Sequence, residues 1–65
     1  MVINTIKYWA KERGLIHKYL AKQIGVSEQT FSRWVRNETQ PDLIQSFHLS
    51  RILGITIDQL VEMKK

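Results

Sequence analysis

Apolar residues recur every three to four positions through most of this chain, the spacing that gathers them on one face of an α-helix. Short polar or glycine-containing segments separate five such stretches. We therefore predict helices over about residues 5–13, 17–24, 28–36, 43–53 and 57–63. Val2 and Ile3 fall outside the first helix and are expected to form a short extended arm, whereas Ile55-Thr56-Ile57 is too short to form a sheet alone. The predicted fold class is all-α, a compact five-helix domain.

The expected signals for helix ends are present. Asp42 precedes the fourth helix and Gln45 follows three residues later, which is a capping-box pattern. Asn4 and Ser27 are N-cap candidates for the first and third helices. Three glycines follow apolar-periodic stretches, as helix-ending glycines do. They are Gly14, Gly25 and Gly54.

Helical-wheel geometry separates an inward from an outward side of each helix. Gln29 and Arg33, four residues apart, point together to the outward side of the third helix. Ile44 and Ile52 fall outside the inward stripe of the fourth helix. The inward positions are Ile6, Trp9, Ala10 and Arg13, then Leu20, Ala21 and Ile24, then Phe31, Trp34 and Val35, and finally Leu43, Phe47, Leu49, Ser50 and Leu53.

The segment 21–31 has the residue types of two helices joined by a tight turn. Ala21 is small where the helices approach closely, and Gly25 stands where the turn needs a left-handed backbone. Val26 fills the angle between the helices, and Phe31 anchors the second one. This pattern indicates a helix-turn-helix, a unit that places its second helix in the DNA major groove.

Seven short motifs follow one another along nearly the whole chain. They are Gly14-Leu15, Leu20-Ala21, Ile24-Gly25-Val26-Ser27, Phe31-Ser32-Arg33-Trp34, Pro41-Asp42-Leu43, Leu53-Gly54-Ile55 and Asp58-Gln59-Leu60. In order and spacing the chain resembles the Cro/CI-repressor-like helix-turn-helix family, also called the xenobiotic-response-element type. The resemblance implies a lambda-repressor-like five-helix domain that binds operator DNA as a homodimer and regulates transcription.

The chain departs from the family pattern at several positions. Family members often pair an Arg of the first helix with a Glu near the end of the third, where this chain has Ala10 and Val35. Both charges are missing together, so we expect an apolar contact between these two residues. Asn37 replaces the usual glycine after the third helix, and asparagine tolerates a left-handed helix end. Ile16 replaces the usual Ser or Thr cap of the second helix, and His17 replaces the usual Gln that touches a phosphate.

Composition and charge agree with a small DNA-binding protein. The 65 residues are expected to form a single domain, 1–65, and with no cysteine and two isolated histidines we expect no disulfide and no metal site. The net charge of +4 lies within residues 1–41, a distribution typical of polyanion binders, although +4 is also ordinary for a small soluble protein. Without a signal-peptide pattern or a membrane-length apolar run, we expect a cytoplasmic protein away from membranes. The family resemblance implies that it comes from a prokaryote or a phage.

The outward face of the third helix is expected to read base edges of double-stranded DNA. Gln29 suits adenine, Arg33 suits guanine, and Thr30 suits a thymine methyl or a phosphate. Glu28 has three readings: acceptance of a hydrogen bond from cytosine, complementing the helix dipole, or repulsion of wrong sites.

Polar residues flanking that face are candidates for DNA phosphate contacts. The set is His17, Lys18, Lys22, Ser27, Arg36, Asn37, Thr39 and Gln40. Backbone N–H groups at the starts of the second and fourth helices would add to it. For the two lysines an ordinary solubilising role is an equal alternative, as an ordinary surface histidine is for His17.

Apolar residues toward the C-terminus exceed what a small core needs, and they predict a homodimer interface. They are Ile44, Ile52, Ile57, Val61 and Met63. The alternative is that they close the core against Val2 and Ile3.

The function predicted is a sequence-specific DNA-binding transcriptional regulator, a repressor that binds a palindromic operator as a homodimer. A DNA-binding antitoxin of a toxin–antitoxin pair and a protein-binding adaptor with the same fold are the alternatives. The chain offers no nucleophile–base pair and no glycine-rich phosphate loop, so we expect no enzyme activity, cofactor or small-molecule ligand.

Overall fold

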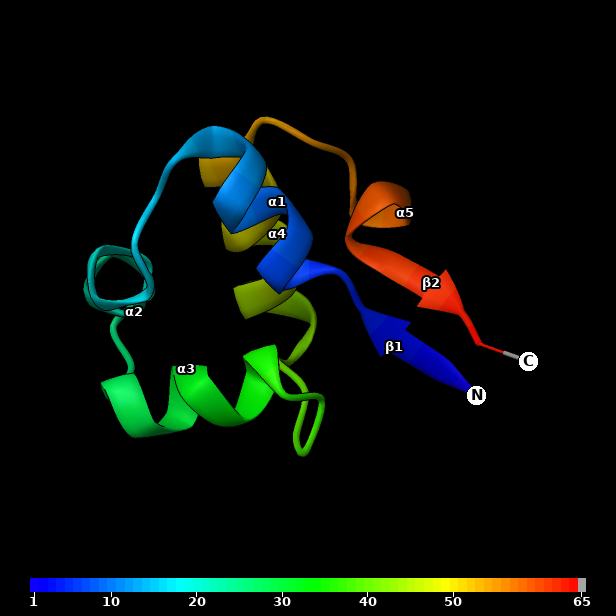
Figure 1. The fold of residues 1–65 in the computed structure, drawn as a ribbon, viewed down its shortest axis with the longest axis horizontal. Coiled ribbons are helices and arrows are strands. Elements are labelled where there is room, and N and C mark those ends of the chain that lie inside the picture. Colours follow the sequence, from blue (N-terminus) through cyan, green and yellow to red (C-terminus); the bar gives the residue numbers. More distant parts are fainter. Residues whose placement is uncertain (65) are drawn as a thin grey trace.

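Five helices and two short strands make up residues 1–64, the part of the chain that the computed structural model describes (Figure 1). In chain order they are β1 (Val2–Asn4), α1 (Ile6–Arg13), α2 (His17–Ile24), α3 (Glu28–Val35), α4 (Leu43–Leu53), α5 (Ile57–Leu60) and β2 (Val61–Met63). The predicted positions of the first four helices are confirmed to within one residue at each end.

The core lies where α1, α2, α3 and α4 meet, and most of the predicted inward positions are buried there. These buried positions are Ile6, Ala10, Leu20, Ala21, Phe31, Trp34, Leu49, Ser50 and Leu53. The rings of Phe31 and Trp34 are tilted against each other with centroids 5.7 Å apart, a favourable aromatic arrangement. Val35 packs against the core cluster that includes Ala10, and a direct contact between those two side chains stays a prediction.

The first turns of α4 do not face the core as predicted. Leu43 and Phe47 are 73% and 53% exposed, so their assignment to the core is wrong. The capping box of Asp42 fixes the start of α4, and Ser46 then lies on the side toward the two strands, where it lines a shallow hollow. Because serine is polar, the helical wheel did not mark Ser46 as an inward position. The predicted inward side of α4 was therefore rotated toward Phe47.

Arg13 is also exposed, although it belongs to the predicted inward stripe of α1. Its Nε donates a hydrogen bond of 2.8 Å to the carbonyl of Leu53, at the end of α4. Its guanidinium lies over the ring of Trp9, 5.1 Å from the centroid. Through its hydrogen bond to Leu53, the Arg13 side chain connects α1 to the end of α4.

The end of the chain is a strand where the sequence predicted a helix. α5 stops at Leu60, and Val61–Met63 pairs antiparallel with Val2–Asn4. The helix predicted over 57–63 is therefore too long and the all-α class is approximate, while the predicted extended arm is confirmed. The backbone N–H of Thr5 continues the pairing with a 2.8 Å bond to the Leu60 carbonyl. A partner strand at the opposite end of the chain leaves no local pattern in the sequence.

A buried asparagine joins the N-terminal strand to the end of α3. Asn4 is 6% exposed, and its Nδ2 donates to the carbonyl of Trp34 at 2.7 Å and to Oε1 of Gln40 at 2.6 Å. Its Oδ1 accepts from the backbone N–H of Ile6 at 3.1 Å, which takes the place of a side-chain cap on α1. Its own backbone N–H donates to Oδ1 of Asn37 at 2.8 Å. This network positions the end of α3 and the loop that follows it.

Backbone and cap signals in the sequence are largely confirmed. Asn37 has φ +61°, the left-handed helix end predicted for it. Ser27 caps α3 by accepting from the backbone N–H of Thr30 at 3.0 Å, and Asp42 forms its capping box. Ile16 provides no side-chain cap for α2, as expected.

Replacing Asn4 by Ala is expected to lower the free energy of unfolding by about 1–3 kcal/mol, because buried backbone groups lose their hydrogen-bond partner. Urea unfolding followed by circular dichroism measures the change, with the exposed residue Gln23→Ala on α2 as the matched control. Equal stability of the two variants would contradict a structural role for the Asn4 amide.

Candidate nucleic-acid interface

The turn between α2 and α3 has the geometry that the sequence predicts. Gly25 has φ +87°, and its backbone N–H donates to the carbonyl of Ala21 at 2.9 Å. The N–H of Val26 donates to the same carbonyl at 3.0 Å, so α2 ends at this turn and the chain changes direction before α3 begins. Phe31 is fully buried and anchors α3 to the core. The two helices are held at a fixed angle by this turn and this anchor.

α3 presents a polar face to solvent on the side opposite its buried aromatic residues. Glu28, Gln29 and Arg33 are exposed, as predicted for base-reading residues. Within residues 1–64 their side chains make no hydrogen bond, so their polar groups are available to a partner. Thr30 is half-buried and its hydroxyl accepts from the Ser27 hydroxyl at 3.0 Å. Thr30 therefore keeps its own O–H donor and its methyl group for a partner.

The start of α2 lies beside α3 and carries exposed polar groups. The ring of His17 is tilted against the ring of Phe31 with centroids 5.6 Å apart, so the histidine lies beside the residue that anchors α3. Lys18 and Lys22 are exposed on the same helix. Because Ile16 provides no side-chain cap, the first backbone N–H groups of α2 are open to an anion.

Two basic residues of α1, outside the predicted set of site residues, lie beside the start of α2. Lys7 and Lys11, together with Ile16 and His17, line a shallow hollow at the start of α2. Their spacing of four residues, which puts both on one side of α1, was the available signal.

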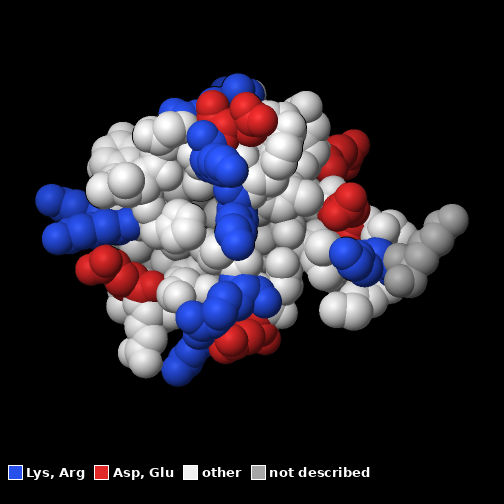
Figure 2. Space-filling model, in the orientation of Figure 1, with Lys and Arg blue, Asp and Glu red and all other residues white. Residues whose placement is uncertain are grey.

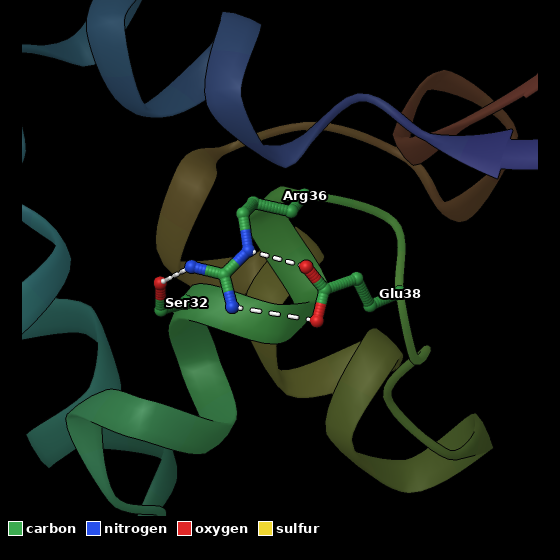
Figure 3. A network of polar contacts seen from close by, with 3 residues as sticks. All are labelled: Ser32, Arg36 and Glu38. Carbon is green, nitrogen blue, oxygen red and sulfur yellow. Dashed lines mark hydrogen bonds and ion pairs between the residues drawn. The ribbon is translucent and has the colours of Figure 1, made fainter.

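Arg36, at the end of α3, is engaged in a polar cluster rather than pointing freely into solvent. Its Nε donates to Oε2 of Glu38 at 2.6 Å, its Nη2 to Oε1 at 3.4 Å, and its Nη1 to the hydroxyl of Ser32 at 2.8 Å (Figure 3). The hydrogen bond from Arg36, helped by the charge of Arg33, holds the pKa of the Glu38 carboxyl below its ordinary value, and the same bond raises the pKa of Arg36. The sequence reasoning missed Glu38, although an acid two residues after an arginine was visible.

Three residues after α3 were predicted to contact phosphates, and within residues 1–64 only one of them has a side chain that is not engaged in the loop. Asn37 and Gln40 use their amides on each other and on Asn4: Gln40 Nε2 donates to Asn37 Oδ1 at 2.9 Å. Thr39 is exposed. The amides of Asn37 and Gln40 thus shape the loop, and their contact with DNA stays a prediction.

Basic side chains spread over α1, α2 and α3 on the face drawn in Figure 2, with acidic side chains set between them. The surface is mixed in charge, so the basic groups do not form one uninterrupted patch. Among residues 1–64 no group of three or more His, Cys, Asp or Glu is placed to hold a metal ion. No helix within that range has the length and apolarity needed to cross a membrane.

Comparison with known proteins agrees with this geometry. The helix-turn-helix family model matches residues 6–60. A helix-turn-helix-type transcriptional regulator of Methanocaldococcus jannaschii, itself uncharacterised, is 30% identical over 57 residues, which are 88% of this chain and 86% of that protein.

Solved structures resemble the fold closely. The crystal structure of a candidate DNA-binding protein from Bacteroides fragilis matches with a TM-score of 0.92 and 35% identity, over 95% of this chain and 100% of that one. A transcriptional regulator from Listeria innocua matches in fold with a TM-score of 0.81 at 24% identity, over 97% of this chain and 64% of that one. Since the family model covers most of the chain and the motif residues lie in the helix-turn-helix geometry, the protein belongs to the Cro/CI-type helix-turn-helix family of DNA-binding transcriptional regulators.

Proposed function

We propose that the protein is a transcriptional repressor that binds a palindromic operator as a homodimer and reads it through the major groove. The observation that carries this proposal is the division of α3 into two sides. Phe31 and Trp34 are buried and hold the helix, while Gln29 and Arg33 are exposed and unengaged within the described chain. Repression requires only that an operator be occupied, so no further surface is needed.

The chemistry of the exposed face supports sequence reading rather than general affinity for DNA. The carboxamide of Gln29 matches N6 and N7 of adenine, and the guanidinium of Arg33 matches O6 and N7 of guanine. The Thr30 methyl suits a thymine methyl group. The Glu28 carboxylate suits the N4 amino group of cytosine.

Phosphate contacts are assigned to both sides of that face. His17, Lys18 and Lys22, with the uncapped start of α2, would hold one strand. Thr39, in the loop after α3, offers an exposed hydroxyl group, whereas the Ser27 hydroxyl would first have to leave Thr30 to donate to a phosphate. Such contacts fix the position of α3 on the duplex without reading sequence.

The homodimer is proposed from apolar side chains that remain on the surface. Of the predicted interface residues, Ile44, Val61 and Met63 are exposed, Ile44 to 76%, whereas Ile52 and Ile57 are partly buried. Leu43 and Phe47, which do not enter the core, enlarge the exposed apolar area on α4. Two copies related by a two-fold axis would cover this area and present two α3 helices to two half-sites.

Arg33→Ala is expected to weaken binding to the selected operator by about 1–3 kcal/mol and to relax the preference at one base pair, because a bidentate base contact is lost. Sites selected from random duplex DNA provide the operator, and fluorescence anisotropy measures affinity. Arg33→Lys keeps the charge without the paired donors, so it is expected to lose the base preference as well but less of the affinity. The assignment fails if both variants lose affinity equally and keep the wild-type preference.

Glu28→Gln is expected to change the preferred base at one position of the operator, since a carboxamide replaces the acceptor proposed for cytosine. Site selection with the variant reads out the change. Asp58→Asn, which removes an exposed first-turn acid from α5, is the charge-matched control. An unchanged preference with higher affinity for all DNA would mean that Glu28 acts through charge alone.

The protein is expected to sediment as a dimer at micromolar concentration, and Ile44→Asp is expected to shift it toward monomer by placing a charge in the apolar interface. Ile16→Asp alters a similarly exposed isoleucine outside the proposed interface and should leave the dimer intact. A wild-type protein that stays monomeric both free and on DNA would exclude this assembly.

A further inference from the structure

The ion pair between Arg36 and Glu38 occupies one end of the face proposed to read DNA. Arg36 follows Arg33 by three residues and Gln29 by seven, spacings that put all three on the same side of a helix. Ser32 lies on that side as well and accepts from Arg36 at 2.8 Å. The guanidinium of Arg36 therefore lies at the C-terminal end of the same exposed face, beyond Arg33.

Glu38 takes up the donors of Arg36 that a phosphate would use. Nε and Nη2 both point at the two carboxylate oxygens, at 2.6 and 3.4 Å, and Nη1 is directed at Ser32 (Figure 3). This forked arrangement of paired donors is the one by which arginine binds either a carboxylate or a phosphate. The same edge of the guanidinium cannot serve Glu38 and a DNA phosphate at once.

We propose that Glu38 competes with a DNA phosphate for Arg36 and so sets the affinity of the protein for DNA of any sequence. The proposal rests on the proposed function, and it adds a residue that lowers binding without reading a base. Gln29 and Arg33 stay unengaged in the described chain, so the competition does not touch the proposed base contacts.

The ion pair between Arg36 and Glu38 is weak enough for a phosphate to displace the carboxylate. The side chains of Arg36 and Glu38 are 55% and 53% exposed, and ion pairs at that exposure are weak because water and salt screen them. A phosphate can displace such a carboxylate at modest cost. The negative charge of the Glu38 carboxylate also opposes a phosphate at this end of α3.

A purely orienting role for Glu38 predicts the opposite effect on binding. If Glu38 held Arg36 in the position needed for DNA, its removal would release the side chain and weaken binding. The direction of the change in affinity therefore separates a competitor from a support.

The test compares wild type, Glu38→Gln, Arg36→Ala and the double variant by anisotropy, on the selected operator and on a duplex of scrambled sequence, across a series of KCl concentrations. Glu38→Gln is expected to bind both duplexes about two- to fivefold more tightly, the range to which a weak ion pair converts, with their ratio unchanged. The slope of log affinity against log salt should steepen by up to about 0.9 in Glu38→Gln. In that variant Arg36 neutralises a phosphate without first giving up the Glu38 carboxylate. In the Arg36→Ala background the same change should have a clearly smaller effect.

Glu12→Gln is the matched control, since it removes one exposed acid from α1 and raises the net charge equally. Weaker binding by Glu38→Gln would overturn the proposal, as would a gain that equals the control or persists in full without Arg36. Absence of salt-sensitive DNA binding by the wild type would instead refute the proposed function itself. Wild-type binding with no gain in Glu38→Gln refutes the competition alone.

Discussion

The buried residue Asn4 connects the N-terminal segment with residues 34–40, and it helps to hold the end of α3 in place. Its amide and backbone bind the start of α1, the carbonyl of Trp34, and the loop residues Asn37 and Gln40. A buried amide is costly unless all its donors and acceptors are used, and here both ends of the group are engaged. The arrangement consequently exists only when β1, α1 and the end of α3 are all in place. β1 then pairs with β2, so the same contact also fixes the C-terminal strand.

The rigid placement of α3 explains how so small a domain can hold polar groups in a defined direction. Phe31 and Trp34 bury one side of the helix in the core, and the Gly25 turn sets its angle to α2. The side chains on the other side of α3 are then oriented by the backbone rather than by contacts of their own. Arg33 has no partner within residues 1–64, whereas Arg36 is held by Glu38. Arg33 can therefore bind a partner directly, whereas Arg36 must first be released from Glu38.

The sequence predicted the features that depend on neighbouring residues, and it missed those that depend on distant ones. The helices, the capping box of Asp42 and the left-handed Asn37 follow from local periodicity and backbone preference. The strand Val61–Met63 was read as helix because its partner lies at the other end of the chain. Phe47 was placed in the core because apolar periodicity cannot see that a serine takes the inward position. Of the candidate site, the exposure of α3 was predictable, while the engagement of Arg36 by Glu38 required coordinates.

An acidic residue lies at each end of the exposed face of α3 and reduces the positive charge there. Glu28 begins the helix, where a carboxylate complements the positive end of the helix dipole. Glu38 follows its last turn and neutralises Arg36. Affinity for DNA of any sequence grows with the number of phosphates neutralised, whereas base contacts add preference. If α3 reads DNA as proposed, acids at both ends of its face would lower general affinity, and binding would depend more heavily on the contacts of Gln29 and Arg33. That balance would favour release from wrong sequences, which compete in great excess with an operator.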